Sequence, residues 1–315
     1  MEVAVQIDKS LYWEIFSSVD FEKIVDQPNI LIAANFWDAE RYQAARNCYR
    51  FMRAIDDLID NYKTEHIRIK PENQAQLEAD VYHWISTVAD TAGGMPSHRE
   101  LTDTLRRFRI PFWPLEAFAR SMIYDIYHDG FPSLKGFIDY AGGASVAPAS
   151  IFVHLCGLTQ SGGIYQAPSF DVREAATPCA IFSYLVHIIR DFRKDHLNHL
   201  NYFPDDLMTK YGLTRDNLLE MAQGKPVSDG FRSMAGELYE TADLYRIRTG
   251  EMIRRIKPLV EPRSQLSLEI IFALYLMVFE RIDVKKGTFS TEELNPDWQE
   301  IRSRVGQVIK DFIPA

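Results

Sequence analysis

The stretch RAIDDLIDNY, residues 53–62, places Asp56, Asp57 and Asp60 among leucine and isoleucine residues. If the stretch is helical, Asp56 and Asp60 lie one turn apart on the same face, where two like charges destabilise a helix by about 0.2–0.5 kcal/mol. Basic residues three positions before Asp56 and three after Asp60 could relieve this repulsion on a solvated face. The alternative is that the two carboxylates together bind a cation.

The residues preceding these aspartates favour the second interpretation. At helical spacing, this segment carries one apolar stripe and one adjoining polar stripe. The apolar stripe consists of Ala45, Cys48, Met52, Ile55 and Ile59, and the polar stripe of Tyr49, Arg53, Asp56 and Asp60. The acids therefore border the predicted core, and we expect them to line a cavity beside it.

A second acidic segment follows far downstream, in SYLVHIIRDFRKDHLNHLNYFPDD, residues 183–206. Asp191 and Asp195 repeat the i,i+4 spacing, with His187 one turn earlier and Arg190 adjacent. Paired carboxylates suit Mg²⁺, a hard ion that binds one or two carboxylates together with substrate phosphates. Arginines beside such pairs can bind diphosphate oxygens through two parallel hydrogen bonds. The two D-x-x-x-D segments therefore predict a magnesium and diphosphate site.

Helical periodicity extends over most of the 315 residues, with few alternating runs to compete with it. No long polar linker or internal repeat divides the chain, so we predict an all-α fold forming a single domain over residues 1–315. The predicted helices span Trp37–Lys63, Gln74–Asp90, His98–Phe108, Trp113–Asp129, Ser133–Gln160, Val172–Asp195, Asp229–Ile256, Ser264–Ile282 and Trp298–Phe312.

A helical cavity with a metal-binding mouth and an apolar body fits a long hydrocarbon that carries a diphosphate. The chemistry that such a cavity supports is ionisation, in which Mg²⁺ and arginine stabilise the departing pyrophosphate. Apolar walls would shield the resulting allylic carbocation from water. The sequence thus predicts an enzyme acting on prenyl diphosphates.

At this point the sequence resembles the squalene/phytoene synthase family, the head-to-head trans-isoprenyl diphosphate synthases, from about Asn29 to about Glu280. YRFMRAIDDLID (49–60) is similar to the first aspartate motif of the family, and HIIRDFRKD (187–195) to the second. AGGASVAPASIF (141–152) occupies the place of a small-residue segment, where small side chains would let a prenyl tail pass close to the backbone.

The resemblance implies an isoprenoid synthase fold around a central cavity and a role for each motif residue. The implied Mg²⁺ ligands are Asp56, Asp60, Asp191 and Asp195. Arg53 and Arg190 would contact the diphosphate, Tyr49 and Tyr275 would be cavity tyrosines, and His187 and Tyr202 would contact substrate. The family reaction couples two farnesyl or geranylgeranyl diphosphates to dehydrosqualene, phytoene or, with NADPH, squalene. The sequence itself gives no indication of an NADPH site.

Several positions depart from the family pattern. Tyr184 and His187 replace a glutamine and an oxygen ligand for magnesium, Lys194 stands where the family usually has glutamate, and Leu200 replaces an arginine. Imidazole is a poorer ligand for Mg²⁺ than oxygen. His187 is accordingly a substituted ligand, a diphosphate donor or a packed core histidine.

These departures leave three functional hypotheses. The first is head-to-head coupling of two prenyl diphosphates. The second is ionisation of one prenyl diphosphate, followed by cyclisation or transfer to another acceptor. The third is a non-catalytic family member that acts as a binding or assembly protein, which loss of the aspartates would favour, although both pairs are intact.

Composition restricts the partners and the compartment. A formal net charge of −9 argues against nucleic-acid binding. Three dispersed cysteines indicate reduced thiols, and residues 1–16 lack the basic and apolar regions of a secretory signal. The run Ile270–Phe279 is too short to span a bilayer and predicts a buried helix. We expect a cytoplasmic protein that an apolar substrate could bring to a membrane surface, and the sequence leaves its oligomeric state open.

Overall fold

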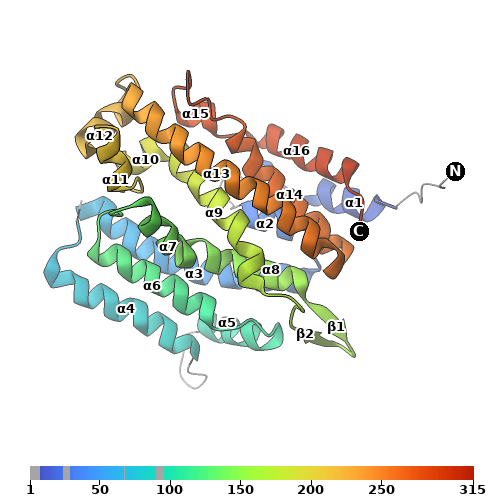
Figure 1. Ribbon diagram of the computed structural model, residues 1–315. Coiled ribbons are helices and arrows are strands. Elements are labelled where there is room, and N and C mark those ends of the chain that lie inside the picture. Colours follow the sequence, from blue (N-terminus) through green and yellow to red (C-terminus); the bar gives the residue numbers. More distant parts are fainter. Residues whose placement is uncertain (1–7, 24–28, 67, 90–95) are drawn as a thin grey trace.

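Helices make up most of the computed structural model, which describes residues 8–23, 29–66, 68–89 and 96–315 (Figure 1). The first half of the chain contains α1 (Ser10–Ser18), α2 (Asn29–Ala34), α3 (Ala39–His66), α4 (Pro71–Ala89), α5 (Pro96–Arg107), α6 (Trp113–Tyr127), α7 (Leu134–Ala144), α8 (Val146–Gly157) and the strands β1 (Thr159–Ser161) and β2 (Ile164–Gln166). The second half contains α9 (Val172–Arg190), α10 (Phe192–Leu197), α11 (Asp205–Lys210), α12 (Arg215–Ala222), α13 (Asp229–Ile256), the 3₁₀ turn η2 (Lys257–Leu259), α14 (Pro262–Phe279), α15 (Thr291–Leu294) and α16 (Trp298–Asp311).

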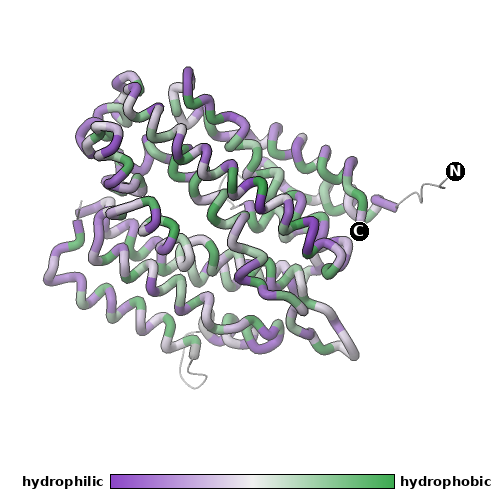
Figure 2. Tube along the Cα trace, viewed as in Figure 1, coloured by the Kyte–Doolittle hydropathy of each residue, from purple (hydrophilic) through white to green (hydrophobic). Residues whose placement is uncertain are grey.

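The helix α9 lies near the centre of the molecule, with α7, α8, α13 and α14 packed around it (Figure 1). Helices α3 to α6 form a layer on one side, and α13, α14 and α16 lie on the other. Along outer helices such as α4 and α16, hydrophilic and hydrophobic residues alternate in patches (Figure 2), as expected of helices with one face toward the core. The all-α prediction is confirmed.

Each predicted helical segment contains a helix, but two segments are divided. The segment predicted over Ser133–Gln160 breaks at Ser145, whose ψ is −48° and φ −122°. Pro148 explains the break, because proline donates no hydrogen bond and its ring clashes with the carbonyl four residues earlier, at Ala144. The predicted helix end at Asp90 lies outside the described residues.

The second division falls inside the downstream acidic segment. Helix α9 ends at Arg190, Asp191 has φ −94° and ψ 2°, and α10 then begins at Phe192. The amide of Asp195 still donates to the carbonyl of Asp191 at 2.8 Å, so the i,i+4 relation survives the break. Asp191 therefore lies between the two helices and Asp195 lies within α10, although their backbones remain one turn apart.

Several short elements were not predicted. They include α1, α2, the helices α11 and α12, α15 and the β1–β2 hairpin. The hairpin turns at Gly162 and Gly163, with φ angles of 57° and 80° that glycine adopts without strain. Short helices carry too few turns for a clear hydrophobic period, which explains why the sequence pattern missed them.

The apolar run Ile270–Phe279 lies in α14, as predicted. Within the described residues, α14 alone has the length and apolar composition to cross a membrane, and 67% of that window is buried inside the protein. Helix α14 packs against α2, α9 and α16.

The three cysteines, Cys48, Cys156 and Cys179, are free thiols.

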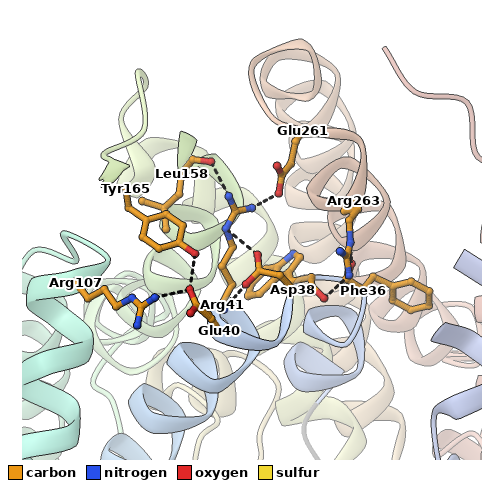
Figure 3. Close-up of polar contacts among 10 residues, drawn as sticks. Phe36, Asp38, Glu40, Arg41, Arg107, Leu158, Tyr165, Glu261 and Arg263 are labelled. Atoms are coloured by element: carbon orange, nitrogen blue, oxygen red, sulfur yellow. Dashed lines mark hydrogen bonds and ion pairs between the residues drawn. The ribbon is translucent and has the colours of Figure 1, made fainter. Parts of the chain in front are cut away.

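A polar cluster joins the beginning of α3 to α14, α5 and the hairpin (Figure 3). The buried Arg41 pairs with Glu261 at the start of α14 and donates to the carbonyl of Leu158 at 3.3 Å. Glu40 accepts hydrogen bonds from Arg107 of α5, at 2.6 Å, and from Tyr165 of β2, at 3.1 Å. These contacts fix the end of α3 that is remote from its aspartates.

The two glycines in α7 have different surroundings. A Cβ added at Gly143 would lie 2.2 Å from both the Ala117 carbonyl oxygen and the Ser121 hydroxyl oxygen of α6, whereas nothing lies within 4 Å of a Cβ added at Gly142. Gly143 thus permits close packing of α6 on α7.

We expect Gly143→Ala to destabilise the protein by about 1–3 kcal/mol, because one of the two helices must move. Gly142→Ala is the matched control and should be neutral or stabilising by up to about 1 kcal/mol, since alanine is the better helix former. Urea unfolding followed by circular dichroism measures both changes. Equal free energies of unfolding for the two variants would contradict this prediction.

Candidate functional site

A cavity of about 1040 Å³ extends between α3, α8, α9, α13 and α14. Its volume is at the upper end of the range of about 300–1,000 Å³ found for pockets that hold drug-sized ligands. One part of its wall is apolar, from residues such as Ile151, Phe152, Ile253 and Ile271. The other part carries the charged residues, so the cavity has an apolar body and a polar mouth. The mouth is lined by Tyr49, Arg53, Asp56, His187, Arg190, Asp191 and Lys194.

The first acidic pair, Asp56 and Asp60, lies on α3 with Arg53 one turn before Asp56. Arg53 forms ion pairs with Asp56, at 3.0 Å, and with Asp57, at 2.6 Å. Burial raises the pKa of Asp56 to about 7, the negative charge of Asp60 adds to the rise, and Arg53 opposes it. The pKa of Asp60 is also raised, chiefly by burial. The pair therefore stores electrostatic repulsion that a bound cation would relieve.

The second acidic pair, Asp191 and Asp195, has two unlike members. Burial alone would raise the pKa of Asp191, but Arg190 outweighs it with hydrogen bonds of 2.8 and 2.6 Å to the two carboxylate oxygens, so this pKa is lowered. Asp195 has no such partner, and burial together with the charge of Asp191 raises its pKa to about 8. The charge of Asp60 raises this pKa further, so the two acidic pairs interact electrostatically.

His187 lies one turn before Asp191 and lines the cavity. Its Nε2 atom is buried and has no hydrogen-bond partner among the described residues, and its ring centroid lies 5.4 Å from that of Tyr275 of α14. Burial, with a contribution from Arg190, lowers its pKa to about 3, so the imidazole is neutral. An unpartnered nitrogen at a cavity wall fits a ligand contact better than a packed core histidine.

Not every predicted site residue lines the cavity. Those that line it are Tyr49, Arg53, Asp56, His187, Arg190, Asp191 and Tyr275. The lining does not include Asp60, Asp195 or Tyr202. Burial raises the pKa of Tyr202, and the charges of Asp60 and Asp195 add to the rise. Tyr202 stacks near Phe131 with ring centroids 6.5 Å apart. The roles assigned to these residues remain predictions.

The structure adds a buried group that sequence reasoning missed. Asp125 of α6 lies 3.8 Å from Lys63 of α3 and accepts a hydrogen bond from the Tyr140 hydroxyl. Burial raises the pKa of Asp125 to about 6, and Lys63 and Tyr140 oppose the rise. The charge of Asp125 also raises the pKa of Asp56, so this group adjoins the first acidic pair. An aspartate within the apolar stretch of residues 121–127, followed by Asp129 at the same spacing of four residues, was the signal that could have identified it.

Only part of the small-residue segment, residues 141–152, lines the cavity. Ala144, Ser145, Pro148 and Ala149 line the cavity, in keeping with a tail passing close to the backbone. Gly142 and Gly143 are not part of the lining, and Gly143 faces α6. The interpretation of the segment as a cavity wall therefore applies to the residues after the glycines.

The donor set fits Mg²⁺ only together with a diphosphate. In the parts of the chain that the structure describes, no three histidine, cysteine or acidic side chains are arranged to enclose a metal ion. Mg²⁺ does not require such an enclosure, because it keeps several waters and completes its shell with substrate phosphates. The raised pKa values of Asp56 and Asp195 indicate carboxylates whose charges lack a cationic partner of sufficient strength.

The sequence pattern of the squalene/phytoene synthase family matches residues 27–302, which is most of the chain. The chain belongs to this family. The resemblance noted from the sequence is thus confirmed, while the assignment of the acidic pairs to the two aspartate motifs of the family stays a prediction.

Two plant family members are similar in sequence. Phytoene synthase 2, chloroplastic, of Oryza sativa subsp. japonica is 22% identical over 202 residues, covering 63% of this chain and 47% of the relative. Phytoene synthase 3, chloroplastic, of Zea mays is 23% identical over 219 residues, covering 68% and 48%. The chain therefore spans about half the length of these relatives.

Solved structures of the family support the fold. A dehydrosqualene synthase in complex with ligand superposes with a TM-score of 0.65 at 17% identity, covering 96% of this chain and 99% of that one. A squalene synthase from Alicyclobacillus acidocaldarius gives a TM-score of 0.61 at 15% identity, covering 84% and 91%. The predicted isoprenoid synthase fold is confirmed.

The acidic pairs should make folding stability depend on pH. Because Asp56 and Asp195 have pKa values of about 7 and about 8 when folded and 3.8 when unfolded, the folded protein binds more protons than the unfolded chain up to about pH 8. Stability of the metal-free protein is therefore expected to fall as the pH rises. Buried histidines such as His187 act in the opposite direction only below about pH 6.5.

Thermal unfolding in EDTA at pH 6.5 and 8.5 tests this expectation, with a lower Tm at pH 8.5. Asp195→Asn should reduce the difference, since asparagine does not titrate. Adding Mg²⁺ with inorganic pyrophosphate at pH 8.5 should raise the Tm of the unaltered protein. A Tm that rises between pH 6.5 and 8.5 in EDTA would contradict the pKa assignment.

Proposed function

We propose that this protein is a Mg²⁺-dependent prenyltransferase that couples two farnesyl or geranylgeranyl diphosphates head-to-head to a squalene-, dehydrosqualene- or phytoene-type product. The observation that carries the proposal is that one member of each acidic pair, Asp56 and Asp191, lines a large cavity beside an arginine that pairs with it. Family membership supports the class of reaction. The volume of about 1040 Å³ suits a ligand larger than a usual drug-sized molecule.

The residues of the chain have separable tasks in this proposal. When bound, Mg²⁺ would neutralise the diphosphate and assist its departure. Arg53 and Arg190 already lie beside the acidic pairs, with donors that can exchange a carboxylate for a diphosphate oxygen. The apolar wall, from residues such as Ile151 and Ile271, excludes water from the allylic cation. Tyr49 and Tyr275 also line the cavity.

Reaction of a single prenyl diphosphate is the second candidate. Two features of the mouth favour it: His187 contributes a neutral nitrogen where the family pattern has an oxygen ligand, and Lys194 adds a positive charge beside the second acidic pair. A site that holds fewer metal ions and a single diphosphate would suit the reaction of one substrate. Cyclisation or transfer to another acceptor would then follow ionisation.

Incubation with farnesyl and geranylgeranyl diphosphate, separately and with or without NADPH, distinguishes the candidates. With Mg²⁺ present, we expect a C30 or C40 hydrocarbon by mass spectrometry of organic extracts, together with release of pyrophosphate. Asp56→Asn should lower turnover by about 100-fold or more, the scale of losing one preorganised electrostatic group. Glu65→Gln, on the exposed end of the same helix, is the matched control and should keep full activity.

Other results lead to other conclusions. Pyrophosphate release with a C15 or C20 product would support the single-substrate reaction. No turnover with any substrate, from protein that is folded by circular dichroism, would support a non-catalytic binding or assembly protein. Equal activity in Asp56→Asn and the unaltered protein would remove the first acidic pair from the mechanism.

A further inference from the structure

The carboxylate of Asp195 is carried by a very short helix. Helix α10 has six residues, Phe192–Leu197, and the break at Asp191 separates it from the long α9. A six-residue helix has little intrinsic stability in water, so its position depends on tertiary contacts. The placement of Asp195 relative to Asp191 therefore depends on whatever holds α10.

Arg193 makes three of these contacts. Its Nε donates to the carbonyl of Phe289 at 3.1 Å, and its two terminal nitrogens donate to the carbonyls of Met221, at 2.5 Å, and Thr288, at 2.8 Å. Three hydrogen bonds from one planar guanidinium define both its position and its orientation. Although Arg193 lies between Asp191 and Asp195 in sequence, its side chain points toward backbone carbonyls rather than toward either carboxylate.

Two of those carbonyls belong to a segment that also borders the cavity. We call residues 283–297, between α14 and α16, the strap; its Thr291, Asn295 and Pro296 line the cavity. Phe289 of the strap has a φ of 54°, which is uncommon for a bulky residue, and its ring is buried.

Further contacts hold the strap in this conformation. Glu293 accepts hydrogen bonds from the amides of Thr288, at 2.6 Å, and Phe289, at 2.7 Å. The Phe289 ring packs edge-on against Phe231, at 5.2 Å, and against Phe192 of α10, at 6.5 Å. The strap is thus a defined surface to which Arg193 attaches α10.

We infer that Arg193 is a positioning residue, which attaches α10 to the strap and to the end of α12 and thereby holds Asp191 and Asp195 at the separation that binds metal and diphosphate. This inference rests on the proposed function, because it concerns the same acidic pair. It assigns Arg193 no contact with the substrate. Partners that orient metal ligands in this indirect way typically contribute about 10–100-fold in metal affinity or activity.

The chain offers a matched control for a test. Arg232 of α13 also donates to a strap carbonyl, that of Gly287, at 2.9 Å, but Arg232 is remote in sequence from both acidic pairs. Arg193→Gln and Arg232→Gln therefore each remove hydrogen bonds to the strap. Only the first removes hydrogen bonds between α10 and the strap.

Binding of Mn²⁺ in the presence of inorganic pyrophosphate can be measured through the electron paramagnetic resonance signal of free Mn²⁺. We expect Arg193→Gln to weaken binding about 10–100-fold and Arg232→Gln to leave it within about twofold. Arg193→Lys keeps the charge and some donors, and it should recover part of the lost affinity. Tm values of all variants report the loss of stability separately.

Three outcomes would overturn the inference. One is unchanged Mn²⁺ affinity in Arg193→Gln, and another is an equal loss in Arg232→Gln, which would assign the effect to the strap as a whole. If Arg193→Gln does not fold, Arg193→Lys at full affinity would be the third. Failure of the unaltered protein to bind Mn²⁺ and pyrophosphate is a different result, because it would remove the diphosphate site and the proposed function with it.

Discussion

Repulsion between carboxylates that the fold holds partly away from water is the constraint on which this site depends. Asp56 and Asp195 have raised pKa values because burial and a neighbouring acid both disfavour their charged forms. The arginines Arg53 and Arg190 offset only part of this cost. The apolar core around α9 must therefore stabilise an arrangement that is electrostatically incomplete without its ligands.

The spacing of the acidic residues explains why the polar part of the cavity could be predicted from the sequence. The role of the buried Asp125 could not be predicted in this way. The acidic pairs repeat a spacing of four residues, which places both members of a pair on one side of a helix whatever the tertiary structure. Asp129 follows Asp125 at the same spacing, but α6 ends at Tyr127, so Asp129 lies beyond the helix and pairs with Arg68 instead. The association of Asp125 with Lys63 and Tyr140 joins three helices and exists only in the folded protein.

Local chemistry likewise decided which parts of the fold were predictable. Long helices such as α3 and α13 can be predicted because their hydrophobic periodicity extends over many turns. The division at Ser145 follows from Pro148, whose effect on the preceding turn could have been recognised. The division at Asp191 has no proline or glycine beside it, and it is sustained by contacts of α10 with distant segments.

The body and the mouth of the cavity are built from different stretches of the same long helices. On α3, Ala45 lines the body while Asp56 lies at the mouth, and on α9, Ala176 and Arg190 divide the wall in the same way. Side chains in the body can therefore change in size without moving the charged groups. Under the proposed function, hydrocarbon length and diphosphate chemistry depend on separate sets of positions, so substitutions in the body can change the product without changing the reaction.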